Sequence, residues 1–486
     1  MTVIVVSFCL FLFMFILIGV LSSRQKKETT EDYLVASRNV NPWLTALSAV
    51  ASNNSGYMFI GLIGFTYRSG FEGIWITMGW ILGDFFTWFW FHKRVRTRSE
   101  DVGAASVPTL LGAVSGEHRD RLIVAIAGVI TFIFLGLYAA AQLKAGSAAT
   151  EALFGWPSWL GATVGAVVVI IYCFSGGIRA SIWTDAAQSC VMIVSMATLV
   201  VYCMMEAGGP ASLMASLEAI SPDLVRWVPE NLAFGAGLYV LGFIFAGVGT
   251  VGQPHILIRF MALDSVGSMQ KARTIYFAWY TIFSLFAFAV GLYARVILPD
   301  LGASLEGDAL VAATERALPT LSMALMPGVL VGLMLAGLFA ATMSTADSQV
   351  LSCSAAITQD VFPKFGESYA ASKIATIAVT FMALGFALYA SSGVFSIVLI
   401  AWAALASMFG PVLLVRLANW PLPAWVGIVM MVAGLAVVIL WGETSYADSV
   451  FKGLPGFIAP LCVYGVLYAV LLRGKETGAP SATATE

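Results

Sequence analysis

Long apolar segments separated by short polar stretches fill almost the whole chain. A helix that crosses a membrane needs about 20 apolar residues, and thirteen segments of roughly that length can be marked along the sequence. They lie near residues 3–23, 44–66, 71–92, 122–147, 157–178, 183–206, 232–257, 272–297, 321–352, 373–392, 395–416, 421–442 and 452–472. The pattern predicts an all-α polytopic membrane protein with about 13 transmembrane helices.

The charged residues support this prediction and suggest an orientation. They make up 11% of the 486 residues, whereas soluble domains carry about 25%. If successive spans alternate in direction, 19 of the 25 Lys and Arg residues fall on one side and 5 on the other, with Lys144 near the outer end of the fourth span. Because loops rich in Lys and Arg stay in the cytoplasm, we expect the N-terminus outside and the C-terminus inside. Basic residues follow the first span and do not precede it, which favours a retained anchor over a signal peptide.

Small and amide residues interrupt the second apolar segment at 51–56, which reads Ala-Ser-Asn-Asn-Ser-Gly. Such side chains compete for backbone hydrogen bonds and are poor helix formers. In hydrocarbon a helix interruption survives only where it lines a protected cavity, and in secondary transporters it marks the binding site. Close helix packing is the competing interpretation, since small residues also serve that purpose.

A second interruption lies in the seventh segment, where 247–254 reads Gly-Val-Gly-Thr-Val-Gly-Gln-Pro. A proline kink alone is the simpler interpretation. The two interruptions are five spans apart, however, and odd spacing gives them opposite orientations, as a 5+5 inverted repeat of spans 2–6 and 7–11 requires. We expect an N-terminal span and loop (1–43), a first repeat (44–208), a second repeat (209–416), two further spans (417–473) and a cytoplasmic tail (474–486).

The ninth segment carries polar residues at helical spacing. Ala341, Ser344, Thr345 and Ser348 fall on one face of a helix, with Asp347 on the adjacent flank. Hydroxyl and carbonyl oxygens are ligands for a hard cation, although serine and threonine also join membrane helices by hydrogen bonds. The carboxylate favours a functional site, because an ionisable residue inside the membrane is a functional hypothesis by default.

Two further carboxylates lie in predicted spans. Asp185 opens the sixth span near its inner end, where helix capping competes with ion binding. Asp84 lies in an aromatic stretch of the third span, and it either pairs with a basic residue or binds a proton. For Lys144, snorkelling to the interface is the simpler interpretation.

Other kinds of chemistry find no support in the sequence. The six cysteines have no paired spacing, and the three histidines fall at predicted inner ends or loops without a metal-ligand pattern. Neither a phosphate-binding Gly-x-x-x-x-Gly-Lys motif nor a nucleophile–base pair is visible. We therefore expect no enzyme activity, no cofactor, no nucleic-acid partner and no obligate protein partner, and transport would depend on an ion gradient or be passive.

Several stretches match a known family. They are Asp-Tyr-Leu-Val-Ala-Ser-Arg at 32–38, Ser-Gly at 55–56, the run from Gly176 to Asp185, Gly-Gln-Pro-His at 252–255 with Arg259, and Ala-Ala-Thr-Met-Ser-Thr at 340–345. On these motifs the chain resembles the sodium:solute symporter family over almost its whole length, and 44–49 is most similar to its sodium/proline branch. The resemblance implies the fold of the leucine transporter.

The resemblance also implies ion sites. The main sodium site would use the backbone carbonyls of Ala51, Asn54 and Ala341 with the hydroxyls of Ser344 and Thr345. Some members hold a second sodium ion, for which the matching residues here are Asp185, Ser344 and Ser348. Asp347 stands where those members have a neutral residue, and its charge would either tighten a second ion or admit a proton.

The solute is expected between the two interruptions. The residues that the resemblance places there are Asn53, Ser55, Gly56, Tyr57, Tyr138, Ala246, Thr250 and Gln253. Three of them depart from the proline branch, because Asn53 replaces an acid and Ala246 and Thr250 replace aromatic residues. Proline or a related amino acid is the first choice of solute, and another small carboxylate remains open.

Together these observations predict a sodium-coupled symporter of a bacterial inner membrane, with Na⁺ as its coupling ion. Proton coupling is the nearest alternative, because of the three buried carboxylates. A membrane sensor that binds the solute without transport is a different class, and it would usually carry a signalling domain.

Overall fold

A computed structural model describes residues 2–114, 119–389 and 394–472. The described chain is helical, with two isolated bridges and no strand. Its α-helices are α1 (Thr2–Ser22), α2 (Thr30–Val35), α3 (Pro42–Asn53), α4 (Gly56–Phe59), α5 (Gly61–Ser69), α6 (Gly73–Asp101), α7 (Val107–Gly112), α8 (Arg121–Phe154), α9 (Ser158–Ala207), α10 (Pro210–Ile220), α11 (Gly235–Val248), α12 (Pro254–Ala262), α13 (Met269–Ile297), α14 (Gly307–Thr314), α15 (Ala317–Leu325), α16 (Gly328–Ala355), α17 (Tyr369–Tyr389), α18 (Val394–Leu417), α19 (Ala424–Gly442) and α20 (Gly453–Leu467). Short turns join them: η1 (Ser23–Gln25), η2 (Ala36–Arg38), η3 (Gly70–Glu72), η4 (Pro222–Val225), η5 (Gly249–Gly252), η6 (Val266–Ser268), η7 (Ala356–Val361), η8 (Pro363–Phe365), η9 (Ser445–Asp448) and η10 (Tyr468–Leu472).

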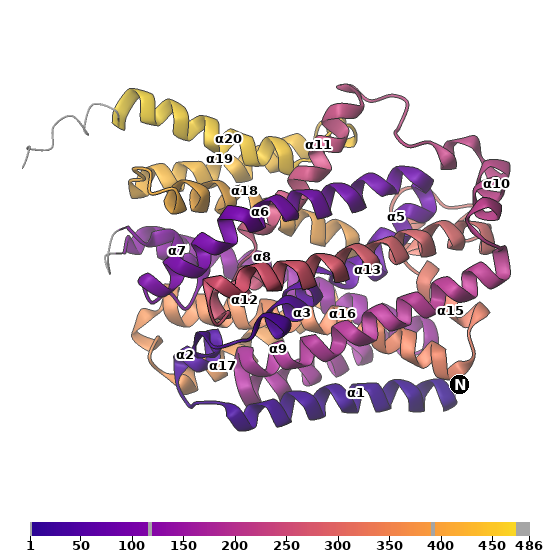
Figure 1. The fold of residues 1–486 in the computed structure, drawn as a ribbon, viewed down its shortest axis with the longest axis horizontal. Helices are drawn as coiled ribbons and strands as arrows, with labels where there is room; N and C mark the ends of the chain where they lie inside the picture. Colours follow the sequence, from indigo (N-terminus) through magenta and orange to yellow (C-terminus); the bar gives the residue numbers. More distant parts are fainter. Residues whose placement is uncertain (1, 115–118, 390–393, 473–486) are drawn as a thin grey trace, which may run out of the picture.

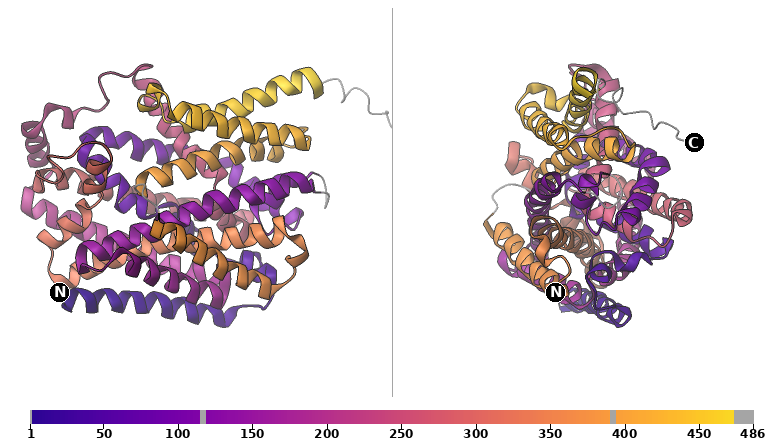
Figure 2. Two further views of the ribbon diagram at one scale, coloured as in Figure 1. Left: turned by 180° about the vertical axis from the view of Figure 1, so that it is seen from behind. Right: turned by 90° about the vertical axis from the view of Figure 1, so that its left-hand side faces the viewer.

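The long helices form one bundle with α16 at its centre. Figure 1 shows α1 along one edge and α19 and α20 along the opposite edge, with α3, α9 and α16 between them. The end-on view in Figure 2 shows the helices gathered around this middle layer. In the most apolar stretch of α16, 83% of the residues are buried, compared with 28% in that of α1. The polar face predicted for the ninth segment therefore lies in the interior of the protein.

The predicted all-α membrane fold is confirmed, whereas the number of spans is not. Ten helices of the described chain are long and apolar enough to cross a membrane, and the count of thirteen stays a prediction. The broken α3–α5 segment and the whole of α6 fall outside the ten, and α9 joins the fifth and sixth predicted spans. The repeat boundaries also stay predictions, and the predicted tail (474–486) lies outside the described residues.

Both predicted interruptions are present. The helix α3 continues as far as Asn53, so the first break is shorter than expected and comprises Asn54 and Ser55. Ser55 caps α4 by accepting a hydrogen bond from the N–H of Tyr57. At the second break α11 tightens into η5, Gln253 is extended, and α12 begins at Pro254, which needs no N–H donor at that position.

A sharp bend divides α9 at Gly177, near the end of the fifth predicted span. Its backbone has φ of 56° and ψ of −140°, a conformation that glycine alone adopts readily. A Cβ atom there would lie 2.4 Å from the carbonyl oxygen of Tyr33, in α2. The side chain of Arg179, two residues on, holds Asp32 of α2 in an ion pair. Burial raises the pKa of Asp32, but hydrogen bonds from Arg179, from the N–H of Lys27 and from Ser37 bring it below its usual value.

We predict that Gly177→Ala destabilises the protein more than Gly155→Ala does. Both glycines have positive φ, but a Cβ atom at Gly155 meets nothing within 4 Å. Each substitution introduces backbone strain of about 1–3 kcal/mol, and the one at Gly177 adds the clash with Tyr33. The midpoint of thermal unfolding in detergent measures the difference. Equal midpoints for the two variants would contradict the tight contact between α9 and α2.

Candidate functional site

The two hydroxyls of the predicted main ion site lie against the first break. Ser344 Oγ is 3.1 Å from the carbonyl oxygen of Ala51 and 3.2 Å from that of Ala341. Thr345 Oγ1 is 3.1 Å from the carbonyl oxygens of Ser52 and Ala341. All five residues are fully buried. Two hydroxyl and three carbonyl oxygens thus gather where α3 meets α16.

The break explains why these carbonyls are free to face α16. Among the described residues no backbone N–H donates to the carbonyl of Ala51 or Ser52, because the helix stops two residues later. A buried carbonyl without a partner is costly in an apolar surrounding, and the hydroxyls of α16 satisfy both. Asn54 lies at the break, where its N–H and its side-chain amide both donate to the carbonyl of Val50. The use of its own carbonyl as an ion ligand stays a prediction.

The residues predicted for a second ion also come together, but a guanidinium group lies among them. Asp185 Oδ2 accepts hydrogen bonds from Ser48 Oγ at 2.7 Å and from Arg259 Nη2 at 3.2 Å. Arg259 Nη2 lies 3.7 Å from Asp347 Oδ1 and donates to the hydroxyl of Ser348. The carbonyl of Ser344, the remaining predicted member, accepts a hydrogen bond from Ser348 at 2.5 Å.

The charges of this cluster do not balance. Asp185 and Asp347 contribute two carboxylates, Arg259 contributes one cation, and all three side chains are 0% exposed. Asp185 Oδ1 has no hydrogen-bond partner in the described part of the chain. Ser181 on α9, which the sequence analysis missed, joins the two acids by contacts to Asp347 Oδ1 at 2.9 Å and Asp185 Oδ2 at 3.5 Å. The cluster has the charge and the free oxygen to accept one monovalent cation or one proton.

Arg259 was counted among the Lys and Arg residues of the inner loops, and this placement is wrong. The short helix α12 follows the second break and carries Arg259 back into the bundle, four residues after His255. Both side chains are fully buried. His92 was expected at an inner end and is likewise buried, on α6. His255 and Arg259 follow Pro254 and are four residues apart. This spacing was the available signal that the two share one face of a helix.

Two of the predicted solute-binding residues at the first break contact the same part of α8. Ser55 Oγ lies 3.5 Å from the hydroxyl of Tyr138, and the N–H of Gly56 donates to Gln142 Oε1 at 3.0 Å. Gln142, one turn after Tyr138, was not predicted. Asn53 turns toward α13 instead, where its side-chain nitrogen is 2.7 Å from the hydroxyl of Tyr276.

At the second break α18 supplies a ring that was not predicted. Trp402 Nε1 donates to the carbonyl of Ala246 at 2.9 Å, and its own carbonyl accepts from Gln253 Nε2 at 3.0 Å. The hydroxyl of Thr250 bonds to the carbonyl of Gly247. The aromatic residues that the proline branch carries at Ala246 and Thr250 are absent, and Trp402 occupies the neighbouring space.

Aromatic rings connect the two breaks. Tyr57 packs on Trp80 of α6 with ring centroids 5.4 Å apart, and Trp80 packs on Trp402 at 5.1 Å. A cavity of about 10 Å³ lies between Tyr57, Trp80 and Tyr280, which is room for about one water molecule. In this structure, therefore, side chains fill the space beside the first break that Tyr57, Trp80 and Tyr280 surround.

Several buried polar atoms near the breaks have no hydrogen-bond partner among the described residues. They are Asn54 Oδ1, Gln142 Nε2, Gln253 Oε1 and both ring nitrogens of His255. His255 packs on the ring of Tyr138 at 5.6 Å, so these atoms belong to one neighbourhood. Each unpaired buried group costs about 1–3 kcal/mol, and a polar solute placed between the breaks would satisfy them.

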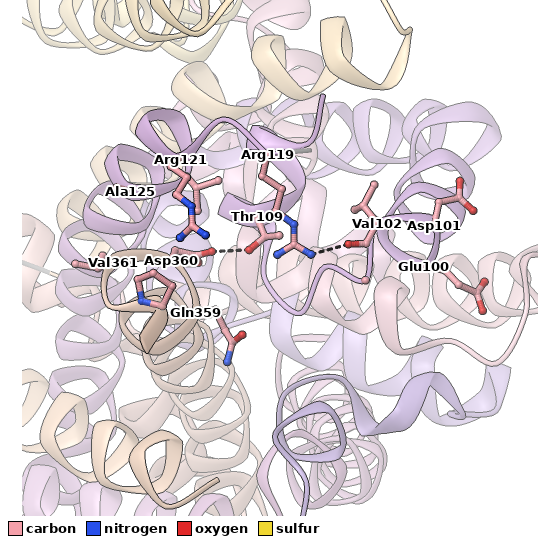
Figure 3. Close-up of a pocket in the computed structure, with 13 residues that line it drawn as sticks. Glu100, Asp101, Val102, Thr109, Arg119, Arg121, Ala125, Gln359, Asp360 and Val361 are labelled. Atoms are coloured by element: carbon pink, nitrogen blue, oxygen red, sulfur yellow. Dashed lines mark hydrogen bonds between the residues drawn. The ribbon is translucent and has the colours of Figure 1, made fainter. Parts of the chain in front are cut away.

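A larger cavity of about 1040 Å³ lies elsewhere, at the end of the bundle where α7 is found. Figure 3 shows Arg119, Arg121 and Asp360 around it. Asp360 Oδ1 accepts hydrogen bonds from Ser106 and Thr109. None of its lining residues belongs to either break. This cavity is consequently separate from the candidate solute site.

Two broken helices around buried polar groups, inside a bundle of membrane-length helices, define the class of secondary transporters. The chain belongs to the sodium:solute symporter family, whose model matches residues 33–420. It is a multi-pass membrane protein of a transporter family, in agreement with the prediction that it is not an enzyme.

Relatives cover nearly the full chain. The chain is 28% identical to the high-affinity proline transporter PutP of Bacillus subtilis over 97% of its length and 98% of the relative's. It is 32% identical to the sodium/proline symporter of Escherichia coli, over 94% and 91% respectively. Its fold matches the substrate-bound outward-open structure of a Na⁺-coupled sialic acid symporter, with a TM-score of 0.79, 17% identity and coverage of 96% and 98%. The match confirms the predicted leucine-transporter-type fold.

We predict that the stability of the protein depends on the balance of charge among Asp185, Asp347 and Arg259. Removing the cation with Arg259→Gln leaves two buried carboxylates together, and breaking a buried pair in this way costs about 3–5 kcal/mol. Adding Asp347→Asn removes one of the two charges and should restore part of the lost stability. Thermal unfolding in a sodium-free choline buffer measures both variants. If the double variant is no more stable than Arg259→Gln, the two side chains are not coupled.

Proposed function

We propose that the protein is a sodium-coupled symporter that imports a small amino acid, with proline as the first candidate. The observation that carries the proposal is the set of oxygens from Ala51, Ser52, Ala341, Ser344 and Thr345 where α3 meets α16. These uncharged oxygens suit a monovalent cation that sheds its water. The relatives named as proline transporters support the choice of solute.

In the proposed mechanism sodium binds first, at the end of α3. It takes over the carbonyls of Ala51 and Ser52, so that the hydroxyls of Ser344 and Thr345 turn their oxygens to the ion and cease to donate to those carbonyls. The ion thereby joins α3 to α16 and fixes the edge of the solute site. The solute then binds between the breaks, beside Gly56.

Coupling follows because both ligands stabilise the same arrangement of α3, α4 and α16, and such linkage is reciprocal. The membrane potential contributes about 2.3 kcal/mol for each charge moved across 100 mV. Because about 1.4 kcal/mol corresponds to a factor of ten, one sodium ion per solute concentrates the solute well over tenfold.

The location and a second ion complete the proposal. The excess of Lys and Arg in alternate loops supports a bacterial inner membrane with the N-terminus outside and the C-terminus in the cytoplasm. The excess negative charge of Asp185 and Asp347 over Arg259 supports a second cation at that cluster. A sodium ion and a proton are both compatible with that charge, and Ser348 contributes its hydroxyl.

A solute other than proline is the second candidate, favoured by the small side chains of Ala246 and Thr250. The ring of Trp402 is held beside them by its hydrogen bond to the carbonyl of Ala246. Another amino acid or a small carboxylate therefore remains compatible with the buried donors and acceptors of Gln142, Gln253 and His255.

We predict that purified protein in liposomes accumulates labelled proline when an inward sodium gradient is imposed. Replacing sodium by choline should abolish accumulation, because the oxygens at α3 and α16 would lack their ion. Protein-free liposomes supply the background. Accumulation that continues in choline but stops when a pH gradient is dissipated would refute sodium coupling. Sodium-dependent uptake of another amino acid, without proline uptake, would refute only the solute.

We also predict that Ser344→Ala combined with Thr345→Ala raises the sodium concentration for half-maximal uptake by about tenfold or more, since two of the ligand oxygens are lost. The matched control is Ser352→Ala, two turns further along α16, where the hydroxyl bonds to the carbonyl of Ser348. The control should retain the normal sodium dependence. An unchanged sodium dependence in the double variant would exclude these hydroxyls as ligands.

A further inference from the structure

A second buried ionisable cluster lies on the opposite flank of α3, around Asp84 of α6. The hydroxyl of Tyr276, on α13, donates to Asp84 Oδ2 at 2.6 Å. Asn53 Nδ2, at the end of α3, donates to the same hydroxyl oxygen at 2.7 Å. Asp84 and Tyr276 are 0% exposed, and Asn53 is 9% exposed. A continuous chain of hydrogen bonds therefore leads from a buried carboxyl group to the edge of the first break.

The surroundings of Asp84 supply no fixed cation. Among the described residues its one ion-pair partner is His92 on its own helix, whose Nε2 lies 3.9 Å from Asp84 Oδ1. The helix α13 contributes Tyr276 and Tyr280, which are uncharged as phenols. From α11, Gly247 packs against the backbone of Asp84.

The remaining neighbours of α6 give the same result. From α12, the apolar ring of Phe260 packs on His92 with centroids 4.2 Å apart, and Arg259 on that helix turns to the other cluster. Within the described residues α5, α18 and the turns η3, η5 and η6 form no ion pair with Asp84. Among the described residues, therefore, the charge of this cluster depends on the protonation of Asp84 and His92 alone.

The hydrogen bonds of Thr87 decide which of the two holds a proton. Its hydroxyl donates to the backbone carbonyl of Asp84 at 2.6 Å, so it has no hydrogen left for His92. With the Thr87 hydrogen on that carbonyl, His92 Nε2, 2.9 Å away, donates to Thr87, while His92 Nδ1 has no partner among the described residues. A second proton on His92 would create a buried N–H without an acceptor. Neutral His92 fits these contacts, and a compensating proton can be accepted only by the carboxyl group of Asp84.

The two protonation states of Asp84 impose opposite hydrogen-bond directions. As a carboxylate, Asp84 accepts from Tyr276, whose oxygen then accepts from Asn53 Nδ2, so that Asn53 Oδ1 points away from Tyr276. As a carboxylic acid, Asp84 donates to Tyr276, whose hydrogen then goes to Asn53. The Asn53 amide turns over to accept it with Oδ1, which leaves Nδ2 on the far side. Amide nitrogen and oxygen occupy nearly the same space, so the heavy atoms scarcely move.

We propose that Asp84 is a proton-binding site which, through Tyr276, determines whether Asn53 offers a hydrogen-bond acceptor or a donor to the solute. This proposal rests on the proposed solute site between the breaks and on the prediction that Asn53 is one of its residues. The acceptor state, with Asp84 deprotonated, suits a solute that carries an amino or imino group. The proton ends on Asp84 in the donor state, and no bond of the solute is changed. Tyr276 is a positioning residue, since it acts through Asn53.

The first test measures the pH dependence of sodium-driven uptake, with labelled proline as the probe. Loss of one hydrogen bond between Asn53 and the charged imino group should weaken proline binding about tenfold on acidification. Tyr276→Phe breaks the relay and should remove this pH dependence while leaving the sodium dependence in place. Tyr293→Phe is the control, because its hydroxyl lies on the same helix but bonds to the carbonyl of Gly208. A Tyr276→Phe variant with the normal pH profile would overturn the proposal.

The second test needs no transport, so it separates this proposal from the proposed function. A protonated carboxylic acid has its own infrared carbonyl stretch, and that band should appear in the purified protein as the pH falls. It should be missing from Asp84→Asn, which retains a hydrogen bond to Tyr276. The band should persist in Tyr293→Phe. If the pH-dependent carboxyl bands of Asp84→Asn and the unmodified protein are identical, Asp84 is not the proton site, whatever the solute proves to be.

Discussion

Two backbone carbonyls without a helical partner are the constraint on which the structure depends. Because α3 stops at Asn53, the carbonyls of Ala51 and Ser52 are left inside an apolar bundle. Hydroxyls on α16 satisfy them, and this requires α16 to run through the centre of the protein. The interaction that stabilises the break is also the one that a cation would replace. Fold stability and ion binding therefore use the same oxygens, so an ion can change how firmly α3 is held.

The helix α3 also lies between two buried ionisable clusters. On one flank Ser48 and Ser52, one turn apart, contact Asp185 and Ser348. On the other flank Asn53 reaches Tyr276 and, through it, Asp84. Charge or protonation on either flank thus acts on the same short helix, at whose end the break begins. This arrangement gives two ligands of different kinds, a metal cation and a proton, a common element through which to act.

The sequence was sufficient for features that are local. Polar residues and glycines inside apolar runs located both breaks and the hydroxyls of α16, because backbone chemistry in a membrane leaves few alternatives. It was insufficient for partners that the fold brings from a distance. Arg259 follows the second break by only a few residues, and whether it enters a loop or the core depends on how α12 folds back. Tyr276, which donates a hydrogen bond to Asp84, is 192 positions away in the sequence, and no local pattern points to it.

The aromatic residues show how one fold can change its solute without changing its breaks. Ala246 and Thr250 are small, and the rings near the breaks are Trp80 from α6 and Trp402 from α18. Trp402 is held by its own N–H, and it packs where a side chain larger than glycine at position 249 would collide with it. The size of the solute site is therefore set by helices that are not themselves broken. Substitutions there can alter selectivity while the carbonyls of α3 and the hydroxyls of α16, on which ion binding would depend, stay as they are.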